Sequence, residues 1–178
     1  SVYRADLPIA TTAAAFAEAL GQLQPPAGIA WGGLRAELRA AYEKSLEPLP
    51  LPGTVKLAEV GRTGSRRLPE DGILTNGAGN FSGWVHRFYQ HPKFRTQLGP
   101  TSGAMGYGAP AGVAAKIAAP NRMVIAFRGD RDFLMNGQEI ATAVQYDAAV
   151  IFIVVNNGMY GTSRMHQEVG IPGRVDSP

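Results

Sequence analysis

The chain has 178 residues, of which 45% are hydrophobic and 17% are charged, and its formal net charge is +3. This length and composition allow one globular core, or a core with a short appendage. The basic residues are scattered, which argues against a nucleic-acid-binding surface. The sequence has no cysteine, which excludes a disulfide framework and a thiolate metal site. No segment is apolar for long enough to span a membrane, and no signal-peptide pattern is seen. A cytoplasmic protein without membrane or nucleic-acid partners is therefore expected.

The first third of the chain is predicted to be helical with interruptions at proline. An alanine-rich helix is expected over residues 11–20, and Pro25 and Pro26 break the chain after it. A second helix is expected from Trp31 until it ends before Pro48, and a third over residues 54–60.

From about residue 72, short apolar strands alternate with helical segments. Strands are expected at 73–75, 122–127 and 150–155, and helices at 81–90, within 101–120 and at 132–147. In the last helix, we expect Phe133, Leu134, Ile140 and Val144 to face inward. Strands that are apolar on both faces and separated by helices indicate a parallel sheet covered on both sides.

The predicted fold class is therefore α/β: a parallel sheet in three layers, with helices on both faces. We expect this domain to cover residues 29–178 and to be incomplete at its C-terminus. Residues 1–28 are interpreted as a linker or as the tail of a preceding central domain. The chain is expected to be a piece of a longer protein.

All three predicted strands run into unusual sequence at their carboxyl ends. The first is followed by Gly77-Ala78-Gly79-Asn80, the second by Gly129-Asp130, and the third by Asn156-Asn157-Gly158. In an open parallel sheet, ligands bind outside the carboxyl ends of the strands. The three clusters are therefore predicted to meet at one edge of the sheet.

The oxygens of this predicted site suit a hard cation. Asp130 offers a carboxylate and Asn157 an amide oxygen, and Mg²⁺ prefers such ligands and completes its shell with water and phosphate oxygens. A phosphate there would also meet the start of the helix near Phe133. Taken singly, an aspartate before a helix is most often an N-cap and Asn-Gly is most often a turn. Their presence together at neighbouring strand ends favours a diphosphate held through magnesium.

A glycine-rich segment, Thr101 to Gly108, precedes the small-residue helix. Dense glycine lets the backbone approach a ligand closely, but no lysine follows as in a phosphate-binding P-loop. Met105 within it is by base rate a core methionine. The three histidines share no metal-ligand spacing.

The segment "GDRDFLMNGQEIATAVQYDAAVIFIVVNNGMYG" resembles the thiamine-diphosphate motif, which opens with Gly-Asp-Gly and closes with Asn-Asn after a little under thirty residues. Asn157 follows Asp130 by 27 positions (157 minus 130), as in that family. "TSGAMGYGAPAGVAAKIAAP" and "TNGAGNFSGWVHRFYQ" are similar to segments of acetolactate synthases. The resemblance covers residues 72–175, and the helix from Trp31 more weakly. It implies the diphosphate-binding domain of an enzyme that uses thiamine diphosphate and Mg²⁺ to decarboxylate a 2-oxo acid and transfer the product.

The resemblance also implies roles for particular residues. The Mg²⁺ ligands would be Asp130, Asn157 and the backbone carbonyl of Met159. Met105 would be the wedge that bends the cofactor beside its aminopyrimidine ring. The implied cofactor-binding residues are Gly79, Asn80, Phe81, Gly103, Ala104, Met105, Gly129, Asp130, Arg131, Asp132, Met135, Asn157, Met159, Tyr160 and Gly161.

Three positions depart from the family pattern. Arg131 stands where the motif has glycine or alanine, Asp132 where it has a small residue, and Phe81 where acetolactate synthases have a polar residue. A charge at Asp132 near two phosphates would oppose binding unless a cation offsets it. A non-catalytic relative that keeps the fold with impaired cofactor binding is therefore the second interpretation. A nucleotide-binding domain of the same sheet type is the third.

The resemblance implies partners as well. The glutamate that activates the cofactor in this family comes from the pyrimidine-binding domain of another subunit, and no segment of this chain resembles that domain. A homo-oligomer, dimer or tetramer, acting on a small 2-oxo acid is therefore expected. No catalytic residue is expected in these 178 residues, which alone should be inactive.

Overall fold

A computed structural model describes residues 3–174, and these divide into two compact units at Lys44 and Ser45. The first unit holds helix α1 and nearly all of α2. In α1, the side chain of Thr12 caps the first turn by accepting a hydrogen bond from Ala15 N at 3.2 Å. The second unit holds the remaining elements and all of the sheet. The predicted domain boundary between residues 28 and 29 stays a prediction.

The elements follow one another in the order α-α-α-β-α-β-α-β-α-α-β-α. Their bounds are α1 Ala13–Gly21, α2 Gly32–Ser45, α3 Leu57–Arg67, β1 Ile73–Asn76, α4 Asn80–Phe88, β2 Gln97–Leu98, α5 Gly108–Ala118, β3 Val124–Gly129, α6 Asp130–Asn136, α7 Glu139–Gln145, β4 Val150–Val155 and α8 Gly161–Gly170. In the described residues, no helix combines the length and apolar character needed to cross a membrane.

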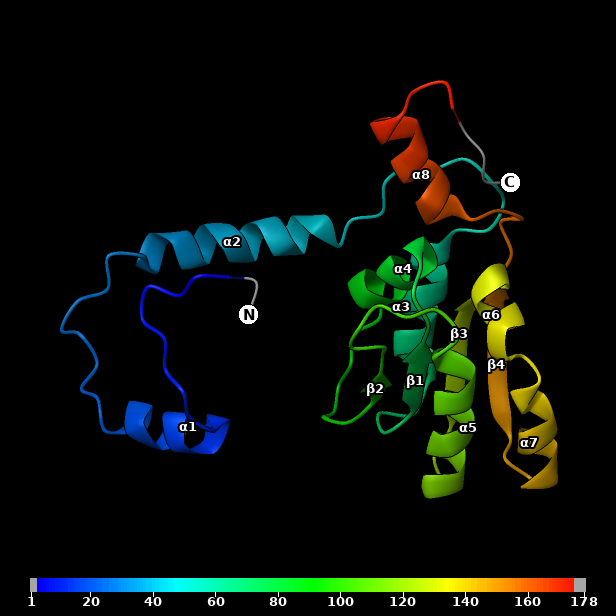
Figure 1. Ribbon diagram of the computed structural model, residues 1–178, viewed down its shortest axis with the longest axis horizontal. Coiled ribbons are helices and arrows are strands. Elements are labelled where there is room, and N and C mark those ends of the chain that lie inside the picture. Colours follow the sequence, from blue (N-terminus) through cyan, green and yellow to red (C-terminus); the bar gives the residue numbers. More distant parts are fainter. Residues whose placement is uncertain (1–2, 175–178) are drawn as a thin grey trace. The chain divides into compact units, whose positions relative to one another are not determined.

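The four strands form one parallel sheet in the order β2-β1-β3-β4 (Figure 1). Every residue of β1 and β3 is buried, as expected for the central strands of a covered parallel sheet. In the register, Asn76 at the end of β1 pairs with Phe127, and Gly129 at the end of β3 pairs with Val155. The carboxyl ends of β1, β3 and β4 therefore lie together, as the sequence predicts.

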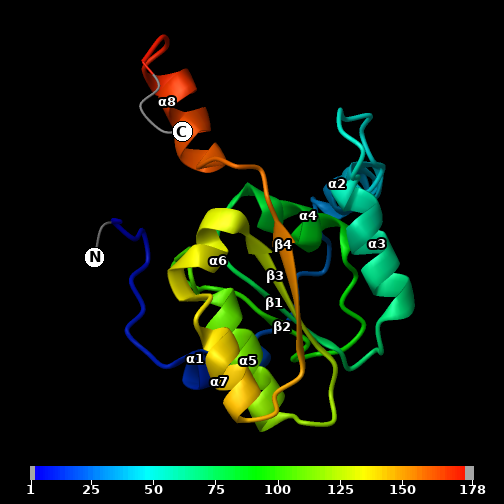
Figure 2. The same ribbon diagram turned by 90° about the vertical axis from the view of Figure 1, so that its right-hand side faces the viewer.

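Helices cover both faces of the sheet (Figure 2). On one face, α3 and α4 pack over a core that includes Leu74, Val85 and Phe127. On the other face, α5 packs over Ile73 and Val124, and together with α7 over Phe152. The predicted α/β fold in three layers is confirmed.

The predicted helix over residues 132–147 is wrong in its continuity and in its inward face. Two helices, α6 and α7, replace it, with a break at Gly137 and Gln138. Leu134, Ile140 and Val144 are 72%, 41% and 76% exposed, whereas Phe133 packs edge-on against Phe152, with ring centroids 6.1 Å apart. The break rotates one half against the other, so a single helical stripe does not describe both halves.

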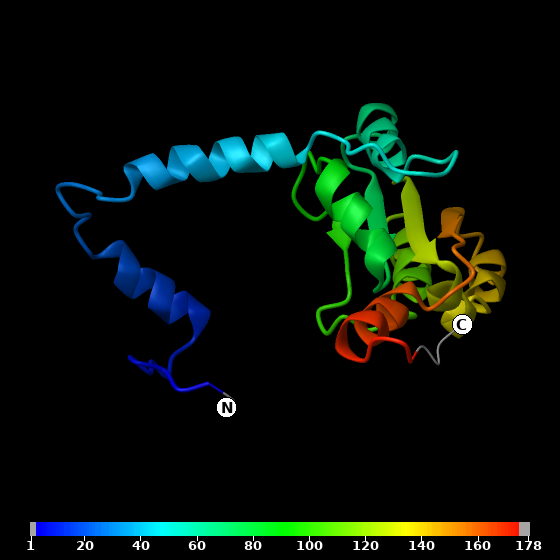
Figure 3. The ribbon, with the colours of Figure 1, turned by 90° about the horizontal axis from the view of Figure 1, so that it is seen from above.

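Two elements are absent from the sequence prediction, and one strand is less covered than expected. The strand β2 is only two residues long, and α8 follows the turn after β4, beyond the carboxyl ends of the strands (Figure 3). Strand β4 is apolar throughout, but it lies at one edge of the described sheet, and its residues Ile151 and Val154 are exposed.

The loop after α4 holds a histidine that should make stability depend on pH. The pKa of His91 lies below its ordinary value because burial disfavours the charged ring, and because His86 is a second positive group nearby. The unfolded chain binds this proton more readily than the folded chain. The contribution of His91 to the free energy of unfolding is therefore fully present at pH values above about 6.5, and it is lost as the pH falls below that value. Unfolding measured at pH 7.5 and 5.5 should show a loss of at most about 1.4 kcal/mol per pH unit from this group.

Two variants check this pH dependence. His91→Gln should flatten it, whereas His166→Gln, at an exposed position of α8, should leave it unchanged. Equal slopes in wild type and His91→Gln would contradict the assignment.

Candidate functional site

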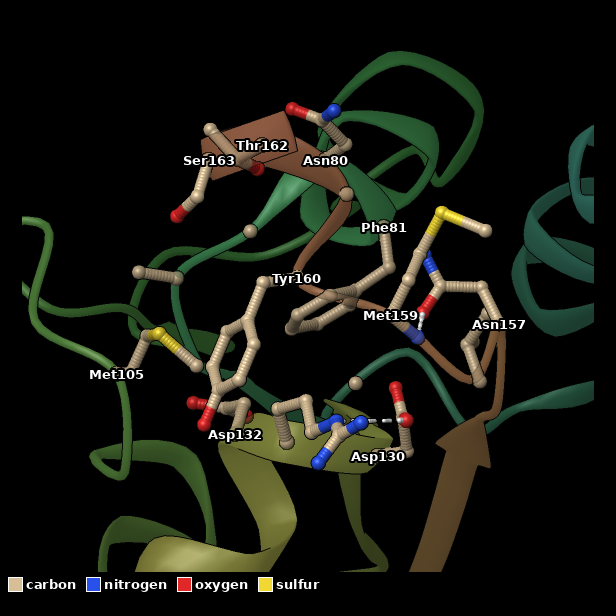
Figure 4. Close-up of a pocket in the computed structure, with 16 residues that line it drawn as sticks. Asn80, Phe81, Met105, Asp130, Asp132, Asn157, Met159, Tyr160, Thr162 and Ser163 are labelled. Atoms are coloured by element: carbon tan, nitrogen blue, oxygen red, sulfur yellow. Dashed lines mark hydrogen bonds and ion pairs between the residues drawn. The ribbon is translucent and has the colours of Figure 1, made fainter. Parts of the chain in front are cut away.

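A pocket lies at the carboxyl ends of β1, β3 and β4 (Figure 4). It is formed by the turn after β1, the glycine-rich loop, the start of α6 and the segment from the end of β4 into α8. Its lining residues are Ala78, Gly79, Asn80, Phe81, Met105, Gly129, Asp130, Arg131, Asp132, Val155, Asn157, Met159, Tyr160, Gly161, Thr162 and Ser163. The structure thus brings together most of the cofactor-binding residues that the sequence selects, from positions up to 82 residues apart (161 minus 79).

Three of the selected residues do not line this pocket. Gly103 and Ala104 are exposed in the glycine-rich loop, and Met135 faces out of α6 with its side chain about half exposed. Four lining residues are not among the predicted cofactor-binding residues: Ala78, Val155, Thr162 and Ser163, of which Ala78 belongs to the predicted cluster after the first strand. The two hydroxyls could have been found, because they directly follow Gly161 at the start of a helix.

Asp130 and Arg131 open helix α6 and face the pocket together. The side chain of Asp130 is 18% exposed and that of Arg131 is 33% exposed, and Arg131 Nε lies 3.7 Å from Asp130 Oδ2. The Arg131 guanidinium also lies over the ring of Tyr160, with its Cζ 5.0 Å from the ring centroid. Arg131 is therefore held between a carboxylate and an aromatic face.

The turn after β4 presents Asn157 at the carboxyl end of the strand next to β3. Asn156 Oδ1 accepts from Gly158 N at 2.9 Å, and Asn157 Oδ1 accepts from Met159 N at 3.2 Å. Gly158 has a φ of +66°, which favours glycine at this position. An amide oxygen has two lone pairs, so Asn157 Oδ1 retains acceptor capacity beyond the turn.

Asp132 is not a free charge in the pocket, because its carboxylate is buried and paired. The Asp132 side chain is 1% exposed, and that of Arg128 at the end of β3 is 0% exposed. Arg128 Nε donates to Asp132 Oδ2, and Arg128 Nη2 donates to the backbone carbonyl of Asp132. Burial lowers the pKa of the Arg128 guanidinium, and the Asp132 carboxylate opposes that shift. The charge of Asp132 is thus offset within the protein, by a residue that the sequence reading did not select.

The same carboxylate fixes the glycine-rich loop. Asp132 Oδ1 accepts from Gly106 N at 2.6 Å, and Asn136 Nδ2 donates to Gly106 O at 3.0 Å. Both backbone polar atoms of Gly106 are therefore bound by side chains of α6. Met105, the preceding residue, is held in the pocket wall by this attachment.

Glycines make room for the buried ion pair. A Cβ on Gly77 would lie 2.1 Å from both carboxylate oxygens of Asp132. A Cβ on Gly108 would lie 2.8 Å from the backbone carbon of Asn76 and 2.9 Å from Arg128 Cδ. The absence of side chains at these two positions lets the pair lie directly against the backbone.

Phe81 fills the space between two strand ends. A Cβ on Gly79 would lie 2.8 Å from the Phe81 ring, and one on Gly129 would lie 2.9 Å from it. The ring also lies 6.1 Å from that of Phe127 in the core, measured between centroids. Phe81 thus adds an apolar surface to this pocket.

The oxygen donors of the pocket fit a hard cation with an incomplete protein shell. Asp130, Asn157 and Met159 all line it, and Asp130 and Asn157 lie across from Met105 (Figure 4). In the described part of the chain, no three histidine, cysteine or acidic side chains gather as a metal cluster. A cation here would take one carboxylate, one amide oxygen and a backbone carbonyl, and would complete its shell from water or a ligand, as Mg²⁺ does.

Comparison with known proteins agrees with this arrangement. Residues 77–178 match the family described as "Thiamine pyrophosphate enzyme, C-terminal TPP binding domain". An acetolactate synthase from Arthrospira platensis is 36% identical over 137 residues, covering 74% of this chain and 23% of that protein. The acetolactate synthase large subunit of Lactococcus lactis is 38% identical over 101 residues, covering 55% of this chain and 17% of that protein.

A solved structure shows the same likeness. The thiamine diphosphate-dependent 4-hydroxybenzoylformate decarboxylase of Rhodococcus jostii RHA1 superposes with a TM-score of 0.66 at 27% identity, over 73% of this chain and 25% of that one. The chain thus spans about a quarter or less of the length of these relatives. The predicted resemblance is confirmed: this chain belongs to the thiamine pyrophosphate enzyme family and carries the C-terminal TPP-binding domain of acetolactate synthase-like enzymes.

Proposed function

We propose that the pocket holds the diphosphate of thiamine diphosphate through Mg²⁺, with Asp130, Asn157 and the carbonyl of Met159 as the protein ligands. One observation carries the proposal: Asp130 and Asn157, from the ends of neighbouring parallel strands, line a single pocket inside the segment that matches the TPP-binding domain. Thr162 and Ser163 add hydroxyl donors at the same rim.

The function that this site supports is carried out by a larger assembly. We infer a 2-oxo acid decarboxylase or carboligase of the acetolactate synthase type, in which another subunit supplies the pyrimidine-binding domain. Thiamine diphosphate, when bound, supplies the electron sink for decarboxylation. The residues of this chain bind the diphosphate end, orient it through the Asp130 and Asn157 oxygens, and place Met105 against the organic part of the cofactor.

Isothermal titration of the intact protein with thiamine diphosphate and Mg²⁺ tests the proposal directly, and CO₂ release from a panel of 2-oxo acids tests the activity. Saturable binding that depends on the diphosphate is expected, with unphosphorylated thiamine much weaker. A protein that binds without releasing CO₂ from any 2-oxo acid would favour a non-catalytic relative. Absence of binding at saturating Mg²⁺ would overturn the proposal.

Asp130→Asn is expected to weaken binding of thiamine diphosphate at saturating Mg²⁺ by about 10-fold, because it removes the only carboxylate of the described lining that is left to face the metal, while keeping the side chain's shape. Titration calorimetry at fixed Mg²⁺ measures the change. Asp71→Asn, at an exposed position before β1, is the matched control and should bind like wild type. Equal affinity in Asp130→Asn and Asp71→Asn would remove Asp130 from the site.

A further inference from the structure

The pocket contains a cation of its own. Among its lining residues only Asp130, Arg131 and Asp132 carry full charges, and Asp132 is paired with Arg128 beneath the pocket. Arg131 is therefore the only cationic side chain that faces this space from the described lining, and Asp130 is the only carboxylate left to face it. The charges that face the pocket are thus one positive group, Arg131, and one negative group, Asp130, with Arg131 Nε 3.7 Å from Asp130 Oδ2.

The Arg131 side chain is held in place although its guanidinium does not use all of its hydrogen-bond donors. Its Nε is buried, and its contact with Asp130 Oδ2 is too long for a hydrogen bond. Within residues 3–174, this Nε has no hydrogen-bond partner. The guanidinium is kept near the pocket by the ring of Tyr160 instead, which holds a cation without using its N–H donors. The Arg131 side chain is 33% exposed, so its terminal Nη groups, rather than the buried Nε, are the donors that a ligand can reach.

A guanidinium suits a diphosphate particularly well. Its planar fork donates two hydrogen bonds to phosphate oxygens, and it is more weakly hydrated than an ammonium group. It also competes with a metal, because a divalent cation bound at Asp130 would lie close to a second positive charge. Arg131 thus adds to the attraction for phosphate and opposes the attraction for Mg²⁺.

We propose that Arg131 binds the diphosphate of the cofactor directly, so that this protein holds thiamine diphosphate with a reduced requirement for Mg²⁺. The inference rests on the proposed function, since it assigns a second cation to the same site. It accounts for a large charged side chain at a position where the thiamine-diphosphate motif has glycine or alanine.

Cofactor affinity measured against Mg²⁺ concentration tests the proposal. Titration calorimetry with thiamine diphosphate is done on the intact protein in EDTA and at increasing Mg²⁺. Wild type in EDTA should keep its affinity to within about 10-fold of the saturated value, whereas Arg131→Gly should lose about 100-fold, as expected for one lost charge-assisted contact. Arg131→Gly should also reach half-saturation at a lower Mg²⁺ concentration than wild type, because the competing charge is gone.

Two further variants separate charge from shape and folding. Arg131→Gln keeps a long polar side chain in the helix and should behave like Arg131→Gly in EDTA. Arg95→Gly is a matched substitution at an exposed residue whose φ of +58° suits glycine, and it should follow the wild-type curve. Unphosphorylated thiamine serves as a probe without phosphate, and its binding should not depend on Arg131.

The outcomes distinguish this proposal from the proposed function. Coincident Mg²⁺ curves for wild type, Arg131→Gly and Arg131→Gln would overturn the role of Arg131 while leaving the cofactor site intact. Loss of wild-type binding in EDTA as steep as that of Arg131→Gly would overturn it as well. Absence of thiamine diphosphate binding at every Mg²⁺ concentration would overturn the proposed function, and this inference with it.

Discussion

Asp132→Ala is expected to lower the free energy of unfolding by about 3–5 kcal/mol, because it leaves the Arg128 guanidinium buried without its counter-charge. The Arg128 side chain is 0% exposed, so water cannot replace the lost carboxylate without opening the structure. The backbone N–H of Gly106 loses its acceptor in the same variant. Asp132→Asn keeps an acceptor for Gly106 but not the charge, and should lose most of the same stability.

Urea unfolding followed by tryptophan fluorescence measures this loss. Trp84 stacks on Phe88 in α4, with ring centroids 5.8 Å apart, and reports on the unit that contains the sheet. A Trp31→Phe background makes Trp84 the only tryptophan, since the chain has two. Asp71→Ala, at an exposed site, is the control, and a loss below about 1 kcal/mol in Asp132→Ala, as for an ordinary surface change, would contradict the role of the pair.

Gly77→Ala is expected to destabilise the chain by about 3 kcal/mol or more, since a methyl group there has no space. The added Cβ would lie 2.1 Å from both carboxylate oxygens of Asp132 and 2.4 Å from its Cγ. Asp132 cannot turn away freely, because Arg128 and Gly106 hold it. The same urea unfolding measures the effect.

Gly83→Ala provides the contrast for this prediction. Gly83 lies within α4, and a Cβ there would meet no atom within 4 Å, so the variant should gain up to about 1 kcal/mol from helix propensity. A double variant identifies the cause of the clash: in the Asp132→Ala background, Gly77→Ala should cost much less than it does alone. Equal costs in both backgrounds would show that Asp132 is not what excludes the methyl group.

The position of the site could be predicted from the sequence because it depends on strand direction. Once β1, β3 and β4 are parallel neighbours, the residues after them must meet at one edge, whatever the details of packing. Asp130 and Asn157 therefore needed only their strands to be recognised. Arg128 was missed because a charge inside an apolar strand is informative only when its partner is known. That partner lies across the junction between a strand and a helix.

The local errors have a different physical cause. Leu134 and Val144 fit an inward stripe only if one helix continues through Gly137, and the break between α6 and α7 turns both side chains out. Asp132 was assigned to the diphosphate from the resemblance, and it does line the pocket, but the sequence does not show that its carboxylate is buried and paired with Arg128. In the first turn of a helix, successive side chains point to different sides, so Arg131 faces the pocket while Asp132 enters the core.

The attachment of Gly106 to α6 has a consequence for protein engineering. Because Asp132 and Asn136 bind both polar backbone atoms of Gly106, the loop that carries Met105 cannot be exchanged as an independent module. A loop transplanted from another enzyme would need an acceptor and a donor at these two positions, and room for the Arg128 side chain behind them. The smallest transferable piece of this site is therefore discontinuous in sequence: the glycine-rich loop together with residues 128–136.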